Sequence, residues 1–199
     1  VERYFESVGL QRQVPEQPSP VNAAARPRVF ALEAGAPRTI VAYDLGLGRT
    51  LWTQAADVRS RIWVGGDFVV EEEGGDLVAR DQQQGAVRWH VAVNGVLVGA
   101  AADRDRAYAV WQEGTKYYLA AYDGSSGSQL WKQEADGQLG APRAQGGLVY
   151  SPFLMQWLTL LDGKTGKHLA RVRGLDQQIS IVRVTSQTAY FGSRQGIFR

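Results

Sequence analysis

The sequence of 199 residues contains no cysteine, so neither disulfide bonds nor thiol chemistry can contribute to its structure or its activity. That absence is compatible with a reducing cytosol and equally with a periplasmic domain stabilised by its sheets alone. No run of 18 or more apolar residues is present, so no membrane-spanning helix is predicted. The 22 lysines and arginines nearly balance the 20 aspartates and glutamates, which leaves a net charge of +2 and no basic stripe of the kind that nucleic-acid binding needs.

Candidate catalytic and metal-binding groups are equally scarce. The two histidines, His90 and His168, lie far apart in the sequence and have no cysteine to join them, so no metal site is predicted. The segment 162–165 resembles a phosphate loop, but Leu158 stands where such a loop requires glycine. The acidic run 71–73 is interpreted as a solvated strand end. We therefore predict no catalytic residue, no cofactor-binding residue, no cofactor and no metal ligand.

What the sequence does contain is a repeat. Four aspartates recur at intervals of 37, 42 and 39 residues, and each is followed four positions later by glycine. In three copies a tryptophan comes four positions after the glycine, and in the fourth copy Ala170 takes its place. The repeat residues are Asp44, Gly48 and Trp52; Asp81, Gly85 and Trp89; Asp123, Gly127 and Trp131; and Asp162 and Gly166. An interval of about 40 residues is the length of a four-stranded propeller blade.

Short alternating segments between the repeat turns predict the strands of these blades. In the second copy they cover residues 60–64, 68–70 and 76–80, and the other copies have the same shape. The fold class is therefore predicted to be all-β, a β-propeller of four-stranded antiparallel blades. Residues 28–199 would form three full and two partial blades, a portion of a ring of seven or eight. Residues 1–27 carry four of the seven prolines and are predicted to be a tail or linker.

Each repeat residue has a predicted structural role. The aspartate carboxylate accepts hydrogen bonds from the turn that follows it, and the glycine provides a positive φ. The tryptophan packs its indole between neighbouring blades, a burial that contributes about 3 kcal/mol. These positions are therefore expected to hold the blades together and not to form a ligand site.

The motif resembles a known repeat family. The PQQ-like repeat has the pattern A-x-D-x-x-T-G-x-x-x-W. Ala42, Ala79 and Ala121 each stand two positions before the repeat aspartate and match it together with the glycine and tryptophan, while the threonine is kept only as Thr165 of the fourth copy. This repeat forms the blades of quinoprotein dehydrogenases and of non-enzymatic relatives, and the resemblance covers residues 28–199. WD40 blades fit less well, because no tryptophan here is followed by aspartate.

The chain resembles the non-enzymatic, cell-envelope type of this family, to which the propeller lipoprotein of the outer-membrane β-barrel assembly machinery belongs, through the repeat itself and not through that protein's own binding loops. That resemblance implies a non-catalytic scaffold in the periplasm that binds other proteins of an envelope complex through its face or rim. It also implies a lipid anchor before residue 1 as the only contact with the membrane, and no nucleic-acid partner.

Two alternatives stay open from the sequence: a fragment of a PQQ-dependent dehydrogenase, and an accessory subunit of a larger membrane-associated complex. The enzymatic relatives use a quinone, Ca²⁺ and a vicinal disulfide, and the last of these is excluded by the lack of cysteine. Apolar and aromatic residues outside the repeat positions are expected mainly to pack between sheets, and some to line a docking face. They are Trp63, Trp111, Tyr117, Tyr118, Phe153, Met155 and Trp157, of which Trp63, Trp111 and Trp157 are the candidate partner-binding residues.

Overall fold

The computed structural model describes residues 27–174, 178–185, 188–193 and 196–198. Within these residues the regular structure is entirely β-strand, and 18 strands form five antiparallel sheets. No helix in the described part of the chain is long and apolar enough to cross a membrane. The predicted tail lies outside the described residues except for Pro27.

We call the five sheets blades 1 to 5 in chain order. Blades 2, 3 and 4 have four strands each and blades 1 and 5 have three. Blade 1 contains β1 (Arg28–Glu33), β2 (Thr39–Asp44) and β3 (Arg49–Ala55). Blade 2 contains β4 (Trp63–Val64), β5 (Phe68–Glu73), β6 (Asp76–Asp81) and β7 (Val87–Ala92). Blade 3 contains β8 (Val96–Asp103), β9 (Arg106–Glu113), β10 (Lys116–Asp123) and β11 (Gln129–Ala135). Blade 4 contains β12 (Arg143–Gln145), β13 (Leu148–Phe153), β14 (Trp157–Asp162) and β15 (His168–Arg173), and blade 5 contains β16 (Ile181–Val184), β17 (Ala189–Ser193) and β18 (Gly196–Phe198).

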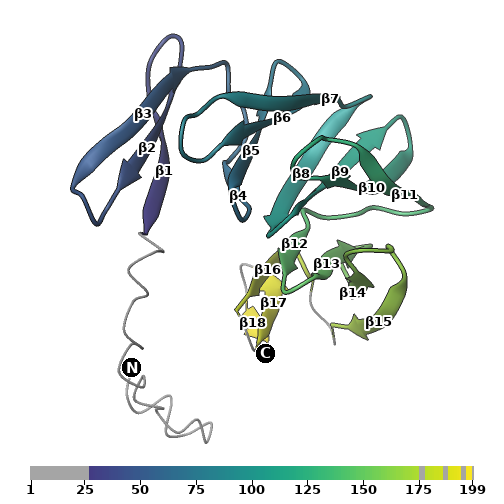
Figure 1. Cartoon of the computed structure of the whole chain (residues 1–199). Helices are drawn as coiled ribbons and strands as arrows, with labels where there is room; N and C mark the ends of the chain where they lie inside the picture. Colours follow the sequence, from purple (N-terminus) through teal and green to yellow (C-terminus); the bar gives the residue numbers. More distant parts are fainter. Residues whose placement is uncertain (1–26, 175–177, 186–187, 194–195, 199) are drawn as a thin grey trace, which may run out of the picture.

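The blades follow one another around an arc (Figure 1). The first strands of successive blades, β4, β8, β12 and β16, contact one another and line the inside of the arc. Within each blade, every strand pairs antiparallel with its neighbour in the chain, so each blade is a simple meander. The predicted fold class, an all-β propeller of antiparallel blades, is confirmed.

The hydrophobic core forms layers between blades. In β10 the side chain of Ala120 belongs to the layer between blades 2 and 3, whereas Leu119 and Ala121 belong to the layer between blades 3 and 4. Because side chains alternate along a strand, a central strand that is buried on both faces can supply two layers. This is why β10 carries the small and aliphatic side chains Leu119, Ala120 and Ala121 in succession.

The first strand of blade 2 is shorter than the sequence predicts. The alternation at residues 60–64 predicts a strand over that range, but β4 spans only Trp63–Val64. The hydroxyl of Ser60 accepts a hydrogen bond from the backbone N–H of Glu72 at 2.7 Å and donates one to the carbonyl oxygen of Arg61. The side chain therefore takes the place of a backbone partner, and the regular ladder begins only beyond it.

Candidate functional site

The repeat turn is built as a set of hydrogen bonds around one carboxylate. In blade 3, Oδ1 of Asp123 accepts from the backbone N–H groups of Ser125 and Ser126 at 3.0 and 2.9 Å, and from both serine hydroxyls. The hydroxyl of Ser125 and the N–H of Ser126 stabilise the ionised form and lower the pKa of Asp123 to about 2. The turn ends at Gly127, whose φ is +73°. The same pair of backbone hydrogen bonds recurs at Asp81 and Asp162, and Oδ1 of Asp44 accepts one, from the N–H of Leu47.

Each repeat tryptophan reaches into the turn of the following blade. The indole Nε1 of Trp89 donates a hydrogen bond at 3.0 Å to the carbonyl oxygen of Gly124, the residue after Asp123. Trp52 and Trp131 make the same bond to the residues after the next repeat aspartates, with partners Gln82 (2.9 Å) and Gly163 (3.0 Å). We call this inter-blade contact the tryptophan hook. Three hooks thus join blade 1 to 2, 2 to 3 and 3 to 4.

The repeat glycine makes room for the hook. A Cβ atom on Gly127 would lie 2.8 Å from the indole ring of Trp89, and one on Gly85 would lie 2.6 Å from the ring of Trp52. Glycine is therefore needed at this position for two reasons: the backbone has a positive φ, and the indole approaches too closely for a Cβ atom. The aspartate, glycine and tryptophan positions therefore join neighbouring blades.

Blade 4 breaks the pattern by a paired exchange. In blades 1 to 3 a buried alanine lies directly across the ladder from the hook tryptophan, as Ala79 lies across from Trp89. In blade 4 the corresponding pair is Leu160 and Ala170, with the large and small side chains exchanged. Blade 4 therefore presents no hook to blade 5, and the two meet through the small cluster of Leu158, Ile179 and Val182.

An unusual hairpin joins β13 and β14. Its tip residues Leu154 and Met155 have φ angles of +51° and +55°, although neither is glycine. Both side chains are exposed, at 47% and 37%. The corresponding hairpins of blades 2 and 3 instead use Gly74–Gly75 and Gly114 at positive φ. Bulky apolar residues rarely adopt this conformation, and two in succession store strain that the fold alone does not require.

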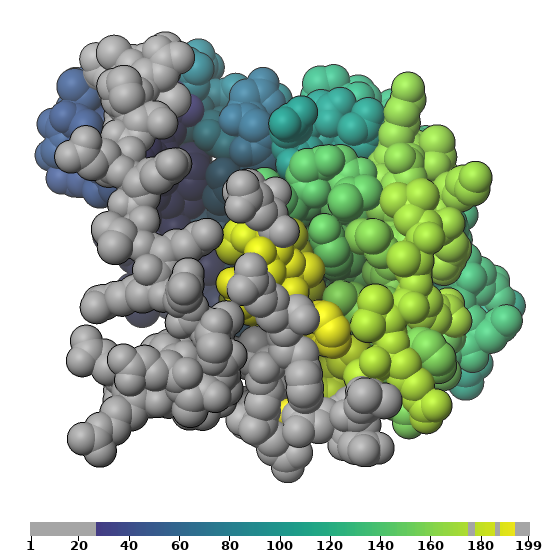
Figure 2. All heavy atoms as spheres, turned by 90° about the horizontal axis from the view of Figure 1, so that it is seen from below, coloured from purple at the N-terminus to yellow at the C-terminus, as the bar shows by residue number. Residues whose placement is uncertain are grey.

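The hairpin tip is held in place from two sides. The backbone N–H of Leu154 donates to the carbonyl oxygen of Gln138 at 2.8 Å, and the carbonyl oxygen of Met155 accepts from the N–H of Ile179. These two partners lie in the segments that lead into β12 and β16. Blades 4 and 5 lie side by side in the view from below (Figure 2), where they are light green and yellow. The tip is thus a rigid apolar projection beside the inner strands.

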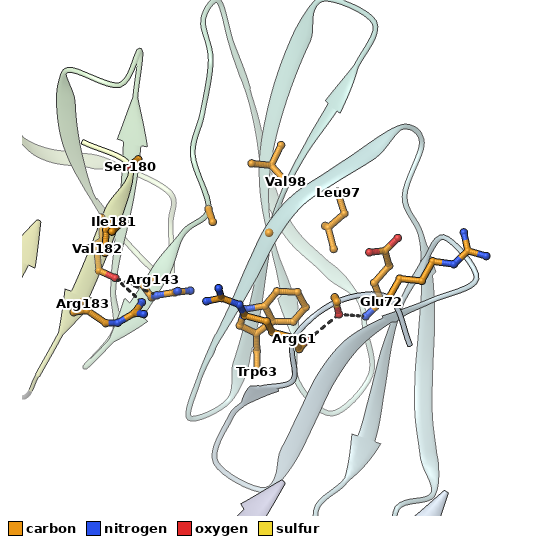
Figure 3. A pocket seen from close by; sticks show the side chains of 14 residues that line it. Arg61, Trp63, Glu72, Leu97, Val98, Arg143, Ser180, Ile181, Val182 and Arg183 are labelled. Carbon is orange, nitrogen blue, oxygen red and sulfur yellow. Dashed lines mark hydrogen bonds between the residues drawn. The ribbon is translucent and has the colours of Figure 1, made fainter. Parts of the chain in front are cut away.

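A hollow of about 730 Å³ lies at the inside of the arc, among the first strands of blades 2 to 5. Trp63, Leu97 and Val98 provide apolar wall, and the charged lining consists of four arginines and Glu72 (Figure 3). The hollow lies near the hairpin tip. The backbone N–H of Ile179 donates to the tip, and the next two residues, Ser180 and Ile181, line the hollow.

Comparison with known families identifies the repeat. A family model described as outer membrane protein assembly factor BamB matches residues 12–95 and 94–195. The chain belongs to this BamB family. The resemblance inferred from the A-x-D and tryptophan positions is thereby confirmed. The first match begins at residue 12, inside the segment that the sequence assigned to a tail.

Solved structures show the same fold as this BamB-family chain. The crystal structure of BamB from Moraxella catarrhalis superposes with a TM-score of 0.63 at 20% sequence identity, over 87% of this chain and 60% of that one. The computationally designed Ika8 protein gives a TM-score of 0.60 at 13% identity, over 83% of this chain and 56% of that one. The chain therefore spans less than two thirds of the length of either protein. No curated protein matches the sequence.

The three tryptophans predicted to bind partners are not brought together. Trp63 lies in the wall of the hollow, and Trp157 lies on blade 4 beneath the guanidinium groups of Arg171 and Arg173, 6.0 and 5.6 Å from its ring. The prediction for Trp111 needs correction, because this residue is only 5% exposed in the layer between blades 2 and 3. Its ring stacks on that of Tyr118 at 5.5 Å, so it is a core residue.

Sequence reasoning missed Leu154, Arg61 and Arg143. The first could have been found, because a leucine and a methionine stand where a hairpin turn normally takes glycine or asparagine. No local signal marks the two arginines, which are brought together only by the arrangement of the blades. In the part of the chain that the structure describes, no three histidine, cysteine, aspartate or glutamate side chains form a group that could hold a metal. His90 and His168 are both exposed on outer strands.

The acidic run 71–73 is not the solvated strand end that the sequence suggests. The side chain of Glu71 is fully buried, and its Oε1 accepts a hydrogen bond from Nε of Arg80 at 2.6 Å. Arg80 also pairs with Glu73 at 2.6 Å. Burial outweighs the attraction of the guanidinium and raises the pKa of Glu71 from its ordinary value of 4.5 to about 7. The other carboxylate oxygen of Glu71 has no hydrogen-bond partner among the described residues.

This shift predicts a pH-dependent stability. Between pH 4.5 and about 7 the folded chain keeps a proton on Glu71 that the unfolded chain has lost. The free energy of unfolding should therefore fall as the pH rises through this window and level off above it. Denaturant melts across the window should show a wild-type advantage over Glu71→Gln that shrinks with rising pH. Glu113→Gln, at an exposed glutamate of β9, is the control; a wild-type advantage that grows with pH would contradict the assignment.

Proposed function

We propose that the chain is part of a non-catalytic scaffold of the bacterial cell envelope, which binds other proteins and acts in the periplasm at the outer membrane. Membership of the family described as outer membrane protein assembly factor BamB supports this proposal. The tether would be a lipid anchor that precedes residue 1, with the proline-rich segment as its linker. The structural similarities, at 20% identity or less, support the fold only.

The observation that carries the proposal is the hairpin tip at Leu154 and Met155. Two exposed apolar side chains sit there on backbone that glycine or asparagine would occupy without strain. Burial recovers only part of this cost in folding free energy, since 47% of Leu154 and 37% of Met155 stay exposed to solvent. Rigid, exposed apolar residues of this kind are typical of positions that become buried when a partner docks.

Photo-cross-linking in cells tests the proposal. A photoreactive amino acid in place of the exposed Gln156, in the full-length protein, should cross-link to a periplasmic or outer-membrane protein. The double variant Leu154→Asn, Met155→Gly should reduce this cross-link about tenfold or more, because it removes both apolar contacts. The same variant should be as stable as the wild type or more so, since its residues suit positive φ.

The matched control is the hairpin of blade 3. A photoreactive residue in place of Thr115, which follows Gly114 at the corresponding tip, should not cross-link to that partner. Equal cross-linking from both hairpins would contradict a docking role for the Leu154–Met155 tip. Cross-links that survive the double variant unchanged would do the same.

A further inference from the structure

Three arginines from three different blades converge at the axis of the arc. Arg61 lies just before β4 of blade 2, Arg143 begins β12 of blade 4, and Arg183 lies in β16 of blade 5. All three line the hollow of about 730 Å³ and also a second hollow of about 360 Å³ next to it. Figure 3 shows the guanidinium groups of Arg61 and Arg143 pointing toward each other, with Arg183 beside them. We call these residues the axial arginine triad.

The triad is positioned by backbone carbonyls. Nε of Arg143 donates to the carbonyl oxygen of Val182 at 3.2 Å, and its Nη1 donates to that of Pro142 at 3.1 Å. Nη1 of Arg183 also donates to the carbonyl oxygen of Val182, at 3.4 Å. Arg143 and Arg183 therefore share the carbonyl oxygen of Val182 as an acceptor, and Arg61 approaches them from the other side of the axis.

The positive charge of the triad is not neutralised by the described part of the chain. Within that part no carboxylate lies within 4.0 Å of any of the three guanidinium groups. Burial and the neighbouring charges of Arg183 and Arg61 lower the pKa of Arg143. Arg143 is half-buried, whereas Arg61 and Arg183 are exposed, so the cluster is open to an incoming anion, which would relieve the repulsion between the like charges. The geometry is thus that of an anion site.

We propose that the axial arginine triad binds the carboxylate side chains of an acidic polypeptide segment that enters the hollow from the face carrying the Leu154–Met155 tip. This inference rests on the proposed scaffold function and names the chemistry of a partner. Planar guanidinium groups bind carboxylates with two parallel hydrogen bonds, which three converging arginines can offer in several orientations.

The walls of the hollow favour a polypeptide over other anions. Trp63, Leu97 and Val98 lie beside the cations, so acidic and apolar side chains of one segment can both be accommodated. The volume lies within the range of pockets that enclose a few side chains. A nucleic acid would need an extended basic stripe, whereas the chain has a net charge of only +2 and its arginines here form a single cluster.

Peptide binding to the full-length protein tests the proposal. The probe is a short fluorescent peptide that alternates glutamate with leucine and glycine, compared with the same peptide carrying glutamine in place of glutamate. The glutamate peptide should bind, lose affinity as salt is raised, and outcompete the glutamine peptide clearly. Arg61→Gln and Arg183→Gln should each weaken its binding about tenfold, while Arg49→Gln, at an exposed arginine of β3, should leave it unchanged.

Several results would overturn the proposal. Equal binding of the two peptides would show that the triad does not recognise carboxylates. Unchanged binding of the glutamate peptide to both Arg61→Gln and Arg183→Gln would show the same. Displacement of the peptide by an equal concentration of inorganic phosphate would assign the site to a small anion. A melting temperature of Arg61→Gln several degrees below the wild type would make the arginine structural, since removal of an unpaired like charge should leave stability unchanged or raise it.

The two proposals can fail separately. Cross-linking from Gln156 that persists in the triad variants, together with no peptide binding, would retain the scaffold function and reject the axial site. Peptide binding that depends on Arg61 and Arg183, together with no envelope cross-link, would retain the axial site and reject the envelope partner at the hairpin tip.

Discussion

Replacement of Trp89 by alanine is expected to lower the free energy of unfolding by about 3–5 kcal/mol. The indole is only 6% exposed and fills the layer between blades 2 and 3. Truncation would leave a cavity there and would also leave the carbonyl oxygen of Gly124 without its donor. Urea or guanidinium melts of the wild type and the variant measure the difference directly.

Two further variants separate the parts of this effect. Trp89→Phe keeps most of the apolar volume and removes the Nε1 donor, so its loss should be the smaller of the two. Val87→Ala changes an exposed side chain of the same strand and should cost well under 1 kcal/mol. A loss below about 1 kcal/mol for Trp89→Ala would show that the hook does not hold the blades together.

Replacement of Gly127 by alanine is expected to destabilise the protein by about 2–5 kcal/mol. The positive φ alone costs about 1–2 kcal/mol for any residue with a Cβ atom. The new Cβ would also lie 2.8 Å from the ring of Trp89, and forcing it into that space costs about 1–3 kcal/mol more. The change should therefore loosen the same inter-blade contact from the opposite side.

Gly114→Ala is the matched control for this experiment. Gly114 has a φ of +59°, close to the +73° of Gly127, but no atom lies within 4 Å of where its Cβ would stand. Its substitution should cost only the conformational part, about 1–2 kcal/mol. Equal losses for the two variants in parallel denaturant melts would mean that the contact with Trp89 contributes nothing.

The blades could be predicted from the sequence because their signals are local. Aspartate, glycine and tryptophan stand at fixed short distances within each repeat, and the turn they form satisfies its own hydrogen bonds, as at Asp123. Strand alternation between the turns is equally local, and at the start of β4 it failed because the Ser60 hydroxyl replaced a backbone partner. The propeller class follows from such short-range patterns.

Other features depend on contacts between blades and left no local signal. Trp111 and Trp63 have similar surroundings in the sequence, yet one is buried and the other lines the hollow. The charged run predicts that Glu71 is exposed, but it is buried and accepts a hydrogen bond from Arg80 of the neighbouring strand. The axial arginine triad joins residues from three blades, so it becomes visible only when the blades are placed around one axis.

The tryptophan hooks all run in the same direction along the chain, from each blade to the one that follows. Each hooked blade therefore carries a donor at one side and a matching acceptor at the other, as Trp89 and the residue after Asp81 do in blade 2. A duplicated blade inserted between two such blades would find both of its partners already in place. Such head-to-tail compatibility lets the chain lengthen by tandem duplication without new interface residues. In the described part of the chain the exchange at Leu160 and Ala170 ends this compatibility, because a copy placed after blade 4 would receive no hook.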